Sequence, residues 1–216
     1  SVCIASRGND GEITFRDWHP VGVIEYGYAV PDPLDANVVF GAGRNEVTRA
    51  DLRTGQVQNI TPIPLTGPEL RVNRTEPLFF APQDPQRMYY AANRLYETTN
   101  AGQSWQAVSP DLTRAAPGVP ASVGSLRLKQ AEQQRGVIYS ASASPVADGL
   151  IWLGTDDGLI WQRRAGTPEW VDVTPPELTP WSKVTQLEAS HVDALAAYAA
   201  VNRMRVDDLK PYIYRT

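Results

Sequence analysis

Cysteine and histidine are nearly missing from this sequence. The 216 residues include one cysteine, Cys3, and two histidines, His19 and His191. A single cysteine excludes an internal disulfide, and so few sulfur and imidazole ligands argue against a transition-metal site. We therefore expect a protein that holds no metal and no other cofactor.

Long apolar runs and clusters of positive charge are missing as well. No stretch approaches the roughly 18 consecutive apolar residues that a membrane-spanning helix needs. The 20 lysines and arginines stand against 24 acidic residues, for a formal net charge of −4. The basic residues are scattered, and only Arg163 and Arg164 are adjacent. Because nucleic-acid binding requires a basic surface, we expect neither a nucleic-acid partner nor a membrane span.

Turn-forming and aromatic residues are abundant instead. The chain has 18 prolines, 16 glycines, 6 tryptophans and 9 tyrosines, and 42% of its residues are hydrophobic. The prolines and glycines interrupt short apolar and β-branched runs, a pattern typical of many short strands rather than of helices. The composition therefore predicts an all-β protein with enough apolar residues for a core.

Four segments of eight residues can be superimposed without gaps. Each is a polar turn that leads into a strand-like run, and each ends in an aromatic residue. They begin at Pro33 (PLDANVVF), Pro82 (PQDPQRMY), Pro145 (PVADGLIW) and His191 (HVDALAAY), which places them 49, 63 and 46 residues apart. Repeats of about 40 to 50 residues with several strands each are typical of β-propeller blades. The spacing therefore predicts a propeller.

Strand-like runs precede these segments and help to set the repeat boundaries. The runs are YGYAV, PLFFA, VIYSASA and KVTQLEA, and we expect each to form the innermost strand of a blade. We place the repeats at about 20–62, 72–113, 136–176 and 181–216, so that residues 1–216 form a single partial propeller. The long middle interval is explained by an inserted loop at 111–135, with one short helix expected near 125–134.

The stretch TTNAGQSW follows the third strand of the second repeat. A tight hairpin needs a residue with positive φ, which Gly102 provides, and an acceptor for backbone N–H groups, which Asn100 provides. We expect the hydroxyls of Thr98 and Ser104 to cap the turn and Trp105 to pack beneath it. These five residues are therefore interpreted as structural.

The same stretch resembles the Asp-box, or BNR repeat, S/T-x-D/N-x-G-x-S/T-W, with Asn100 at the position that is usually aspartate. Eroded relatives follow the third strands of the first and third repeats. Nearly the whole chain is similar to large bacterial BNR-repeat proteins labelled glycosyl hydrolases, which in turn are similar to sortilin-type ectodomains and two-propeller xyloglucanases. The resemblance implies a secreted or periplasmic protein whose propeller has seven blades.

A ring of seven blades is larger than this chain, which holds about three complete blades and most of a fourth. An unclosed propeller leaves sheet edges and apolar faces in water. We therefore expect the remainder of a larger propeller protein, or self-association, to complete the ring. A ring of four blades is the alternative.

Propeller ligands usually bind at the mouth of the central channel, so we searched the loops near the innermost strands for acids and aromatic residues. Asp17 and Glu25 are the candidate catalytic carboxylates. Trp18, His19 and Glu188 are the candidate substrate-binding residues, with Trp18 placed to stack on a sugar ring. The structural alternative is that Asp17 caps a turn, Trp18 packs between blades, His19 bonds to the backbone and Glu188 pairs with an arginine.

Two functions follow from these observations. The first is glycan binding or hydrolysis by a glycoside-hydrolase-like propeller, with a polysaccharide as ligand. The second is a non-catalytic, sortilin-like scaffold for a protein or peptide ligand. The adjacent acids Asp156 and Asp157 resemble a catalytic pair, but their D-D-G context indicates a turn between strands. No complete catalytic set is present, so whether the protein is an enzyme stays open.

Overall fold

The computed structural model describes residues 1–8, 10–64, 66, 69–120 and 135–216. This part of the chain contains strands, turns and two short 3-10 helices, η1 (Phe15–Asp17) and η3 (Met204–Val206), and no α-helix. The all-β class is therefore confirmed. The helix expected near 125–134 lies outside the described residues. Within them, no helix is long and apolar enough to cross a membrane.

The strands form five antiparallel sheets. The first large sheet has the order β3 (Tyr28–Pro31), β4 (Val38–Gly43), β5 (Glu46–Asp51), β6 (Gln56–Asn59). The second is β7 (Leu78–Ala81), β8 (Asp84–Ala91), β9 (Leu95–Thr98), β10 (Gln106–Ala107). The third is β11 (Ile138–Ala143), β12 (Ile151–Thr155), β13 (Ile160–Arg163), β14 (Trp170–Asp172). The fourth has three strands, β15 (Lys183–Ala189), β16 (Ala197–Arg203) and β17 (Asp208–Arg215). A small sheet joins β1 (Val2–Cys3) to β2 (His19–Pro20).

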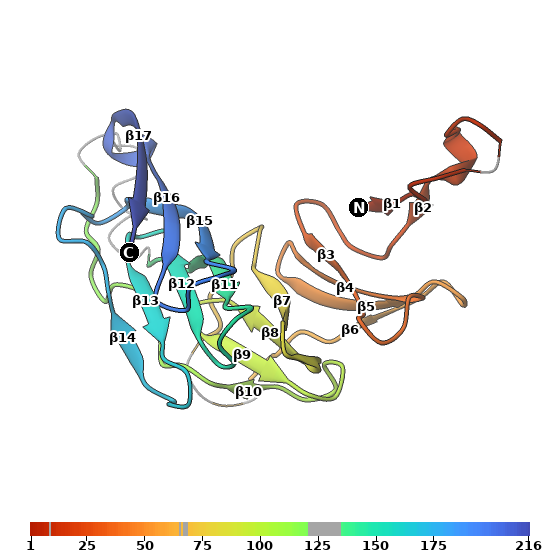
Figure 1. Ribbon diagram of the computed structural model, residues 1–216, viewed down its shortest axis with the longest axis horizontal. Helices are drawn as coiled ribbons and strands as arrows, with labels where there is room; N and C mark the ends of the chain where they lie inside the picture. The colour runs from red at the N-terminus through yellow and green to blue at the C-terminus, as the bar shows by residue number, and fades with distance from the viewer. Residues whose placement is uncertain (9, 65, 67–68, 121–134) are drawn as a thin grey trace.

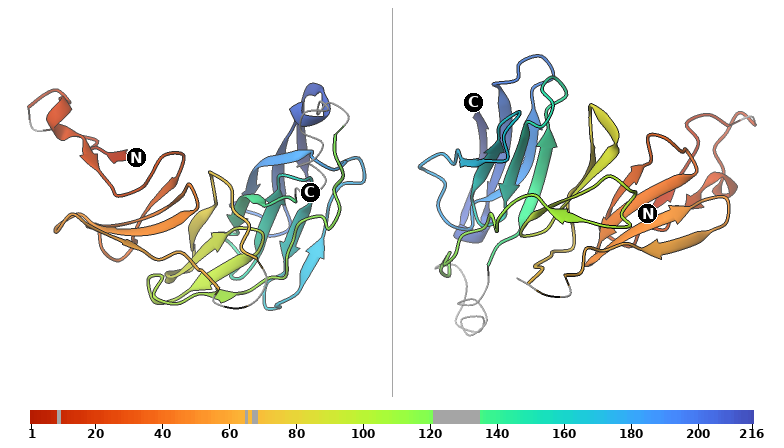
Figure 2. Two further views of the ribbon diagram at one scale, coloured as in Figure 1. Left: turned by 180° about the vertical axis from the view of Figure 1, so that it is seen from behind. Right: turned by 90° about the horizontal axis from the view of Figure 1, so that it is seen from below.

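The four large sheets stand side by side in an arc. Their first strands, β3, β7, β11 and β15, lie on the inner side of the arc, and the last strands lie on its outer side (Figure 1). The small β1–β2 sheet and η1 project away from the arc beside the first sheet (Figure 1). The views from behind and from below show the same succession of separate sheets (Figure 2). This arrangement is that of propeller blades.

The sheets pack face to face, so each inner sheet needs apolar residues on both faces. Along β8, Met88 and Tyr90 join the core shared with the first sheet, and Tyr89 and Ala91 join the core shared with the third. The alternation follows from the two-residue period of a strand. Burial of each large side chain contributes about 1.5 to 3 kcal/mol.

The aromatic residues that end the eight-residue segments fill successive junctions. Phe40 packs against the second sheet, Tyr89 against the third and Trp152 against the fourth. Tyr198, the corresponding residue of the fourth sheet, is 44% exposed. The segments recognised in the sequence therefore supply one large side chain to each junction.

The TTNAGQSW stretch forms a tight turn after β9. Gly102 has a φ of 81°, and its N–H donates to Thr98 Oγ1 at 3.1 Å. Asn100 Oδ1 accepts the Ser104 N–H at 3.0 Å, and Asn100 Nδ2 donates to Ser104 Oγ at 2.9 Å. Trp105 does more than pack beneath this turn, because its indole N–H donates to the Ile60 carbonyl of the first sheet at 2.7 Å.

The indole contact recurs at the next junction. Trp170 of the third sheet donates its indole N–H to the Val108 carbonyl of the second sheet at 3.0 Å. Ile60 and Val108 occupy matching positions, because each follows the last residue of the outermost strand of its sheet. Two junctions are therefore joined by a tryptophan that reaches backward to the preceding sheet.

We predict that Trp105→Phe and Trp170→Phe each lower the free energy of unfolding by about 1 kcal/mol or somewhat more, because a part-buried carbonyl loses its donor while most of the ring packing is kept. Chemical denaturation monitored by circular dichroism measures the change. Trp18→Phe is the matched control, since Trp18 is 50% exposed and outside the sheet junctions. Equal effects of all three substitutions would contradict the role of the indole N–H.

Candidate functional site

Three of the residues proposed from the sequence lie on the N-terminal projection. Asp17 ends η1, and its carboxylate accepts the Thr14 N–H at 2.6 Å, a hydrogen bond that lowers the pKa of Asp17. Trp18 follows it and is half exposed, and His19 pairs with Cys3 in the small β1–β2 sheet. In this position Asp17 caps a turn.

The other two proposed residues lie at separate places. Glu25 pairs with Arg44 at 3.1 Å, next to the first sheet, whereas Glu188 on β15 pairs with His191 at 2.9 Å. Among the described residues, no hydrogen bond or ion pair joins Asp17, Glu25 and Glu188 to one another. Their catalytic and substrate-binding roles stay predictions.

Asp156 and Asp157 form the β12–β13 turn and are both buried. Asp157 accepts the Thr155 hydroxyl at 2.6 Å and the Arg114 N–H at 2.8 Å. Asp156 accepts the Val137 N–H and pairs with Arg205 at 2.9 Å. Burial raises the pKa of Asp157, and the hydrogen bonds from Thr155 and Arg114 counteract it. Both carboxylates thus join the β12–β13 turn to neighbouring segments of the chain, in agreement with the turn interpretation.

Aromatic and basic side chains stand at the starts of the inner strands of three sheets. Tyr28 opens β3, Tyr139 lies near the start of β11, and Lys183 opens β15. The Lys183 ammonium lies 3.4 Å from the centre of the Tyr139 ring, a close cation–π contact. The pKa of Tyr28 is raised by burial and further by its proximity to Tyr139. The inner edge of the arc therefore presents two phenols and an amine at one end.

Charged and aromatic residues continue this end of the first sheet. The Arg74 guanidinium lies 5.4 Å from the centre of the Tyr26 ring, and the Arg74 carbonyl accepts the Arg44 N–H at 3.3 Å. Tyr26 is 54% exposed. Arg44 and Asn45 have φ values of 48° and 72°, as the two-residue turn between β4 and β5 requires, and Tyr26 has a φ of 66°.

We name these residues the inner-edge cluster: Glu25, Tyr26, Tyr28, Arg44, Arg74, Tyr139 and Lys183. The cluster combines aromatic rings with cationic and anionic groups that donate and accept hydrogen bonds. Sequence reasoning identified only Glu25 among them. Tyr26, Tyr28, Tyr139 and Lys183 lie in the runs expected to be inner strands, YGYAV, VIYSASA and KVTQLEA, whereas Arg44 follows β4 and Arg74 precedes β7. The alternation alone did not say which residues face the centre.

A buried acid lies behind the cluster, at the junction of the first and second sheets. Glu76 is 1% exposed, and neither carboxylate oxygen has a hydrogen-bond partner in the described part of the chain. Burial raises its pKa to about 7, an effect that the nearby backbone of Asn73 and Asn45 lowers only in part. The Tyr90 hydroxyl is also buried without a partner, and Glu76 contributes to its raised pKa.

Comparisons with solved structures place the chain in the propeller class. A GH74 xyloglucanase from Xanthomonas campestris matches 87% of this chain and 28% of its own, at 17% identity and a TM-score of 0.56. An auxiliary nutrient binding protein from Bacteroides thetaiotaomicron matches 86% of this chain and 40% of its own, at 11% identity and a TM-score of 0.51. These structures are propeller-like, and they establish the fold alone.

A third structure extends the same picture. The extracellular domain of a protein assigned as a one-component system from B. thetaiotaomicron matches 82% of this chain and 21% of its own, at 12% identity and a TM-score of 0.50. The chain therefore spans between a fifth and two fifths of these three structures. Neither a protein-family model nor a curated protein matches the sequence.

We predict that Glu76 makes stability fall as pH rises. Because its folded pKa, about 7, lies above the ordinary value of 4.5, the folded state binds the proton more tightly. The stability is therefore fully present below about pH 4.5 and is lost as pH rises to about 7, by about 3 kcal/mol. Glu76→Gln should remove this loss and raise the melting temperature at pH 7.5, measured by calorimetry.

Glu25→Gln is the matched control, because the Glu25 side chain is 58% exposed. It should leave the pH dependence of unfolding unchanged. The same pH dependence in Glu76→Gln as in the unmodified chain would show that Glu76 is not the titrating group.

Proposed function

We propose that the inner-edge cluster binds a glycan. The observation that carries the proposal is the position of Tyr28, Tyr139 and Lys183 at the starts of three inner strands, with the Lys183 ammonium 3.4 Å from the centre of the Tyr139 ring and exposed Tyr26 two residues before Tyr28. Aromatic rings accept the apolar faces of sugar rings, and flanking charged groups bind hydroxyls, so such a surface recognises a polyhydroxyl ring on both its faces and its edges. A xyloglucanase and a nutrient binding protein with a similar fold support this choice.

Binding is better supported than hydrolysis. Glycoside hydrolysis needs two carboxyl groups about 5 to 10 Å apart across the scissile bond. Here Glu25 is paired with Arg44, and Asp17 caps a turn on the N-terminal projection. In this proposal Asp17 and Glu25 are the carboxylates to test for hydrolysis, and Trp18, His19 and Glu188 are the further substrate contacts to test. An extracellular location, secreted or periplasmic, is part of the proposal and is supported by the extracellular domain of similar fold.

A BNR-repeat propeller that serves as a non-catalytic scaffold for a protein or peptide is the second candidate function. It is favoured because Glu25 in the inner-edge cluster, and Asp156 and Asp157 in the β12–β13 turn, each already bind a partner within the chain. Substitution of Tyr28 and Tyr139 by alanine distinguishes the two candidates, because a peptide scaffold has no reason to bind soluble polysaccharides through these two residues.

The test is a binding screen of the purified chain against soluble polysaccharides, including xyloglucan, followed by calorimetry on those that bind. We expect Tyr28→Ala and Tyr139→Ala each to weaken binding about tenfold, since each removes one stacking ring. Lys183→Met should weaken it several-fold. Release of reducing ends that is lost in Asp17→Ala and Glu25→Ala would add hydrolysis to the function.

Tyr198→Ala is the matched control. Tyr198 is also a half-exposed tyrosine beside an arginine, with Arg215 5.8 Å from its ring centre, but it lies on the fourth sheet away from the cluster. The control should bind as the unmodified chain does. If Tyr198→Ala weakens binding as much as Tyr28→Ala, or if no polysaccharide binds, the proposed site is wrong.

A further inference from the structure

A groove lies on the outer side of the junction between the first and second sheets, the side opposite to the inner-edge cluster. One wall is the end of β6 with the segment that follows it, including Gln58 and Thr61. The other wall is the turn after β9, including Gln103 and Ser104. The volume of the groove is about 590 Å³, within the range of about 300 to 1,000 Å³ that is usual for small-molecule sites.

The two walls are joined by the fold itself. The Trp105 indole N–H donates to the Ile60 carbonyl at 2.7 Å, and both residues line the groove. Gly102 lies so close to Ile60 that a Cβ at this position would collide with the Ile60 side chain. A ligand would therefore not have to order the walls, which lowers the free-energy cost of binding.

The charge of the groove comes from one side chain. Arg94, in the turn between β8 and β9, is among the lining residues. The described residues that line the groove include no aspartate, glutamate, lysine or histidine. The groove is therefore positive, although the chain as a whole has a formal net charge of −4.

The Arg94 guanidinium is not neutralised within the described part of the chain. Its Nε is buried without a hydrogen-bond partner there, so the cation has lost hydration without gaining a counter-charge. Burial raises the pKa of Tyr96, and the nearby charge of Arg94 counteracts part of this rise. Asp111 also acts on that pKa, but it is held by Arg71 at 2.8 Å and Arg135 at 3.2 Å. An anion in the groove would supply the missing charge.

The fourth sheet shows that an arginine in this turn can be neutralised by its own hairpin. In the superimposed segments Arg94 corresponds to Arg203. The Arg203 guanidinium pairs with Asp208 at 3.4 Å and donates to the Thr179 hydroxyl at 3.3 Å. Among the described residues, Arg94 has no such acid, and this difference indicates a role beyond holding the turn.

The groups around Arg94 suit a sugar with a negative charge. The exposed side-chain amides of Gln58 and Gln103 can each donate and accept hydrogen bonds, as sugar hydroxyls require. The Trp105 ring adds an aromatic surface. A carboxylate forms charge-assisted hydrogen bonds with a guanidinium that a neutral sugar cannot form.

We propose that this groove binds a sugar that bears a carboxylate, with the Arg94 guanidinium bound to the carboxylate and the amides of Gln58 and Gln103 bound to the sugar hydroxyls. The site lies on the outer side of the arc. It is separate from the inner-edge cluster and does not depend on the glycan proposal made for that cluster.

The experiment compares two probes that differ only in charge, trigalacturonate and its trimethyl ester. Calorimetry measures the affinity of each for the purified chain. We expect trigalacturonate to bind about tenfold more tightly than the ester, because only the acid offers carboxylates. Arg94→Met should weaken trigalacturonate binding about tenfold and leave binding of the ester unchanged.

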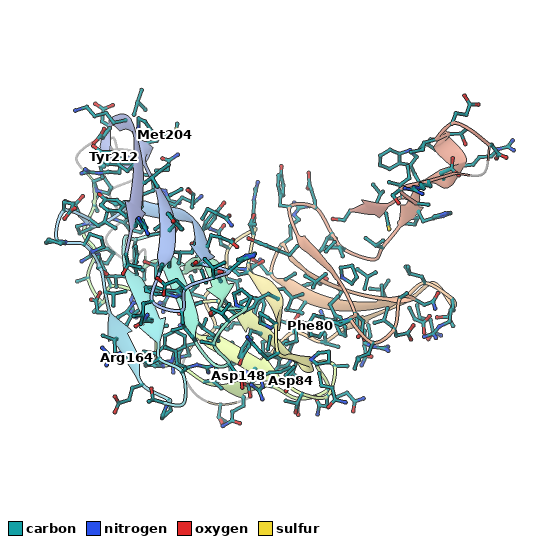
Figure 3. All side chains as sticks on the ribbon, viewed as in Figure 1. Phe80, Asp84, Asp148, Arg164, Met204 and Tyr212 are labelled. Carbon is teal, nitrogen blue, oxygen red and sulfur yellow. The ribbon has the colours of Figure 1, made fainter. Side chains whose placement is uncertain are left out.

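Two further variants serve as controls. Arg164→Met makes the same change in net charge, and Arg164 is an exposed arginine directly after β13, away from the groove (Figure 3); it should bind both probes as the unmodified chain does. Gln103→Glu places a negative charge on the rim at an exposed position, so folding is kept. It should weaken binding of trigalacturonate several-fold and leave the ester unaffected.

Tyr28→Ala separates this proposal from the one made for the inner-edge cluster, because it should leave trigalacturonate binding unchanged. Four results would overturn the proposal. Trigalacturonate may show no binding, or the same affinity as its ester. Arg94→Met and Arg164→Met may weaken binding equally, which would be an effect of net charge. Tyr28→Ala may abolish binding where Arg94→Met does not, which would place the acidic sugar in the inner-edge cluster. An acidic peptide may bind through Arg94 where trigalacturonate does not, which would assign the groove to a peptide.

Discussion

Face-to-face packing of neighbouring sheets is the constraint on which the rest of the structure depends. A sheet that is covered on both faces has no side of its strands left for water, so its residues must be apolar at odd and even positions alike. β8 meets this demand with Met88, Tyr89, Tyr90 and Ala91 in succession, all buried. β17 does not, because Leu209 and Ile213 are more than three quarters exposed. The difference distinguishes the second sheet, which lies inside the arc, from the fourth sheet, which lies at one of its ends.

Polar side chains secure the ends of the sheets where apolar packing stops. Arg71 joins Asp111 at 2.8 Å, and Arg114 donates to the backbone of Asp157 at 2.9 Å. Both arginines come from segments that cross between sheets; Arg71 bonds to the segment after β10, and Arg114 bonds to the turn between β12 and β13. At the opposite end Arg87 bridges Asp84 and Asp148, which lie side by side in Figure 3. The junction between the second and third sheets is therefore held at its ends by charge and in its middle by packing.

Much of this architecture could be predicted from the sequence, because turns and strand periods are local properties. Gly102 and Asn100 specify their turn by conformation and hydrogen bonding alone, and the four aromatic segments each fall at the start of a buried strand or within one. The inner-edge cluster was mostly missed, since the centre-facing positions of an inner strand depend on neighbours far away in sequence. Glu76 was missed because nothing in NRTEP indicates burial of its carboxylate. The contact of Trp105 with the first sheet was missed because its acceptor, the Ile60 carbonyl, lies 45 residues earlier in the sequence.

The direction of the indole contacts has a consequence for how the chain is made. Trp105 bonds to a residue 45 positions earlier, and Trp170 to one 62 positions earlier. Each contact thus points toward the part of the polypeptide that is synthesised first. Each acceptor carbonyl is therefore part of the chain before its indole leaves the ribosome, whereas the contacts of Arg71 with Asp111 and of Arg114 with Asp157 form only after later residues are made.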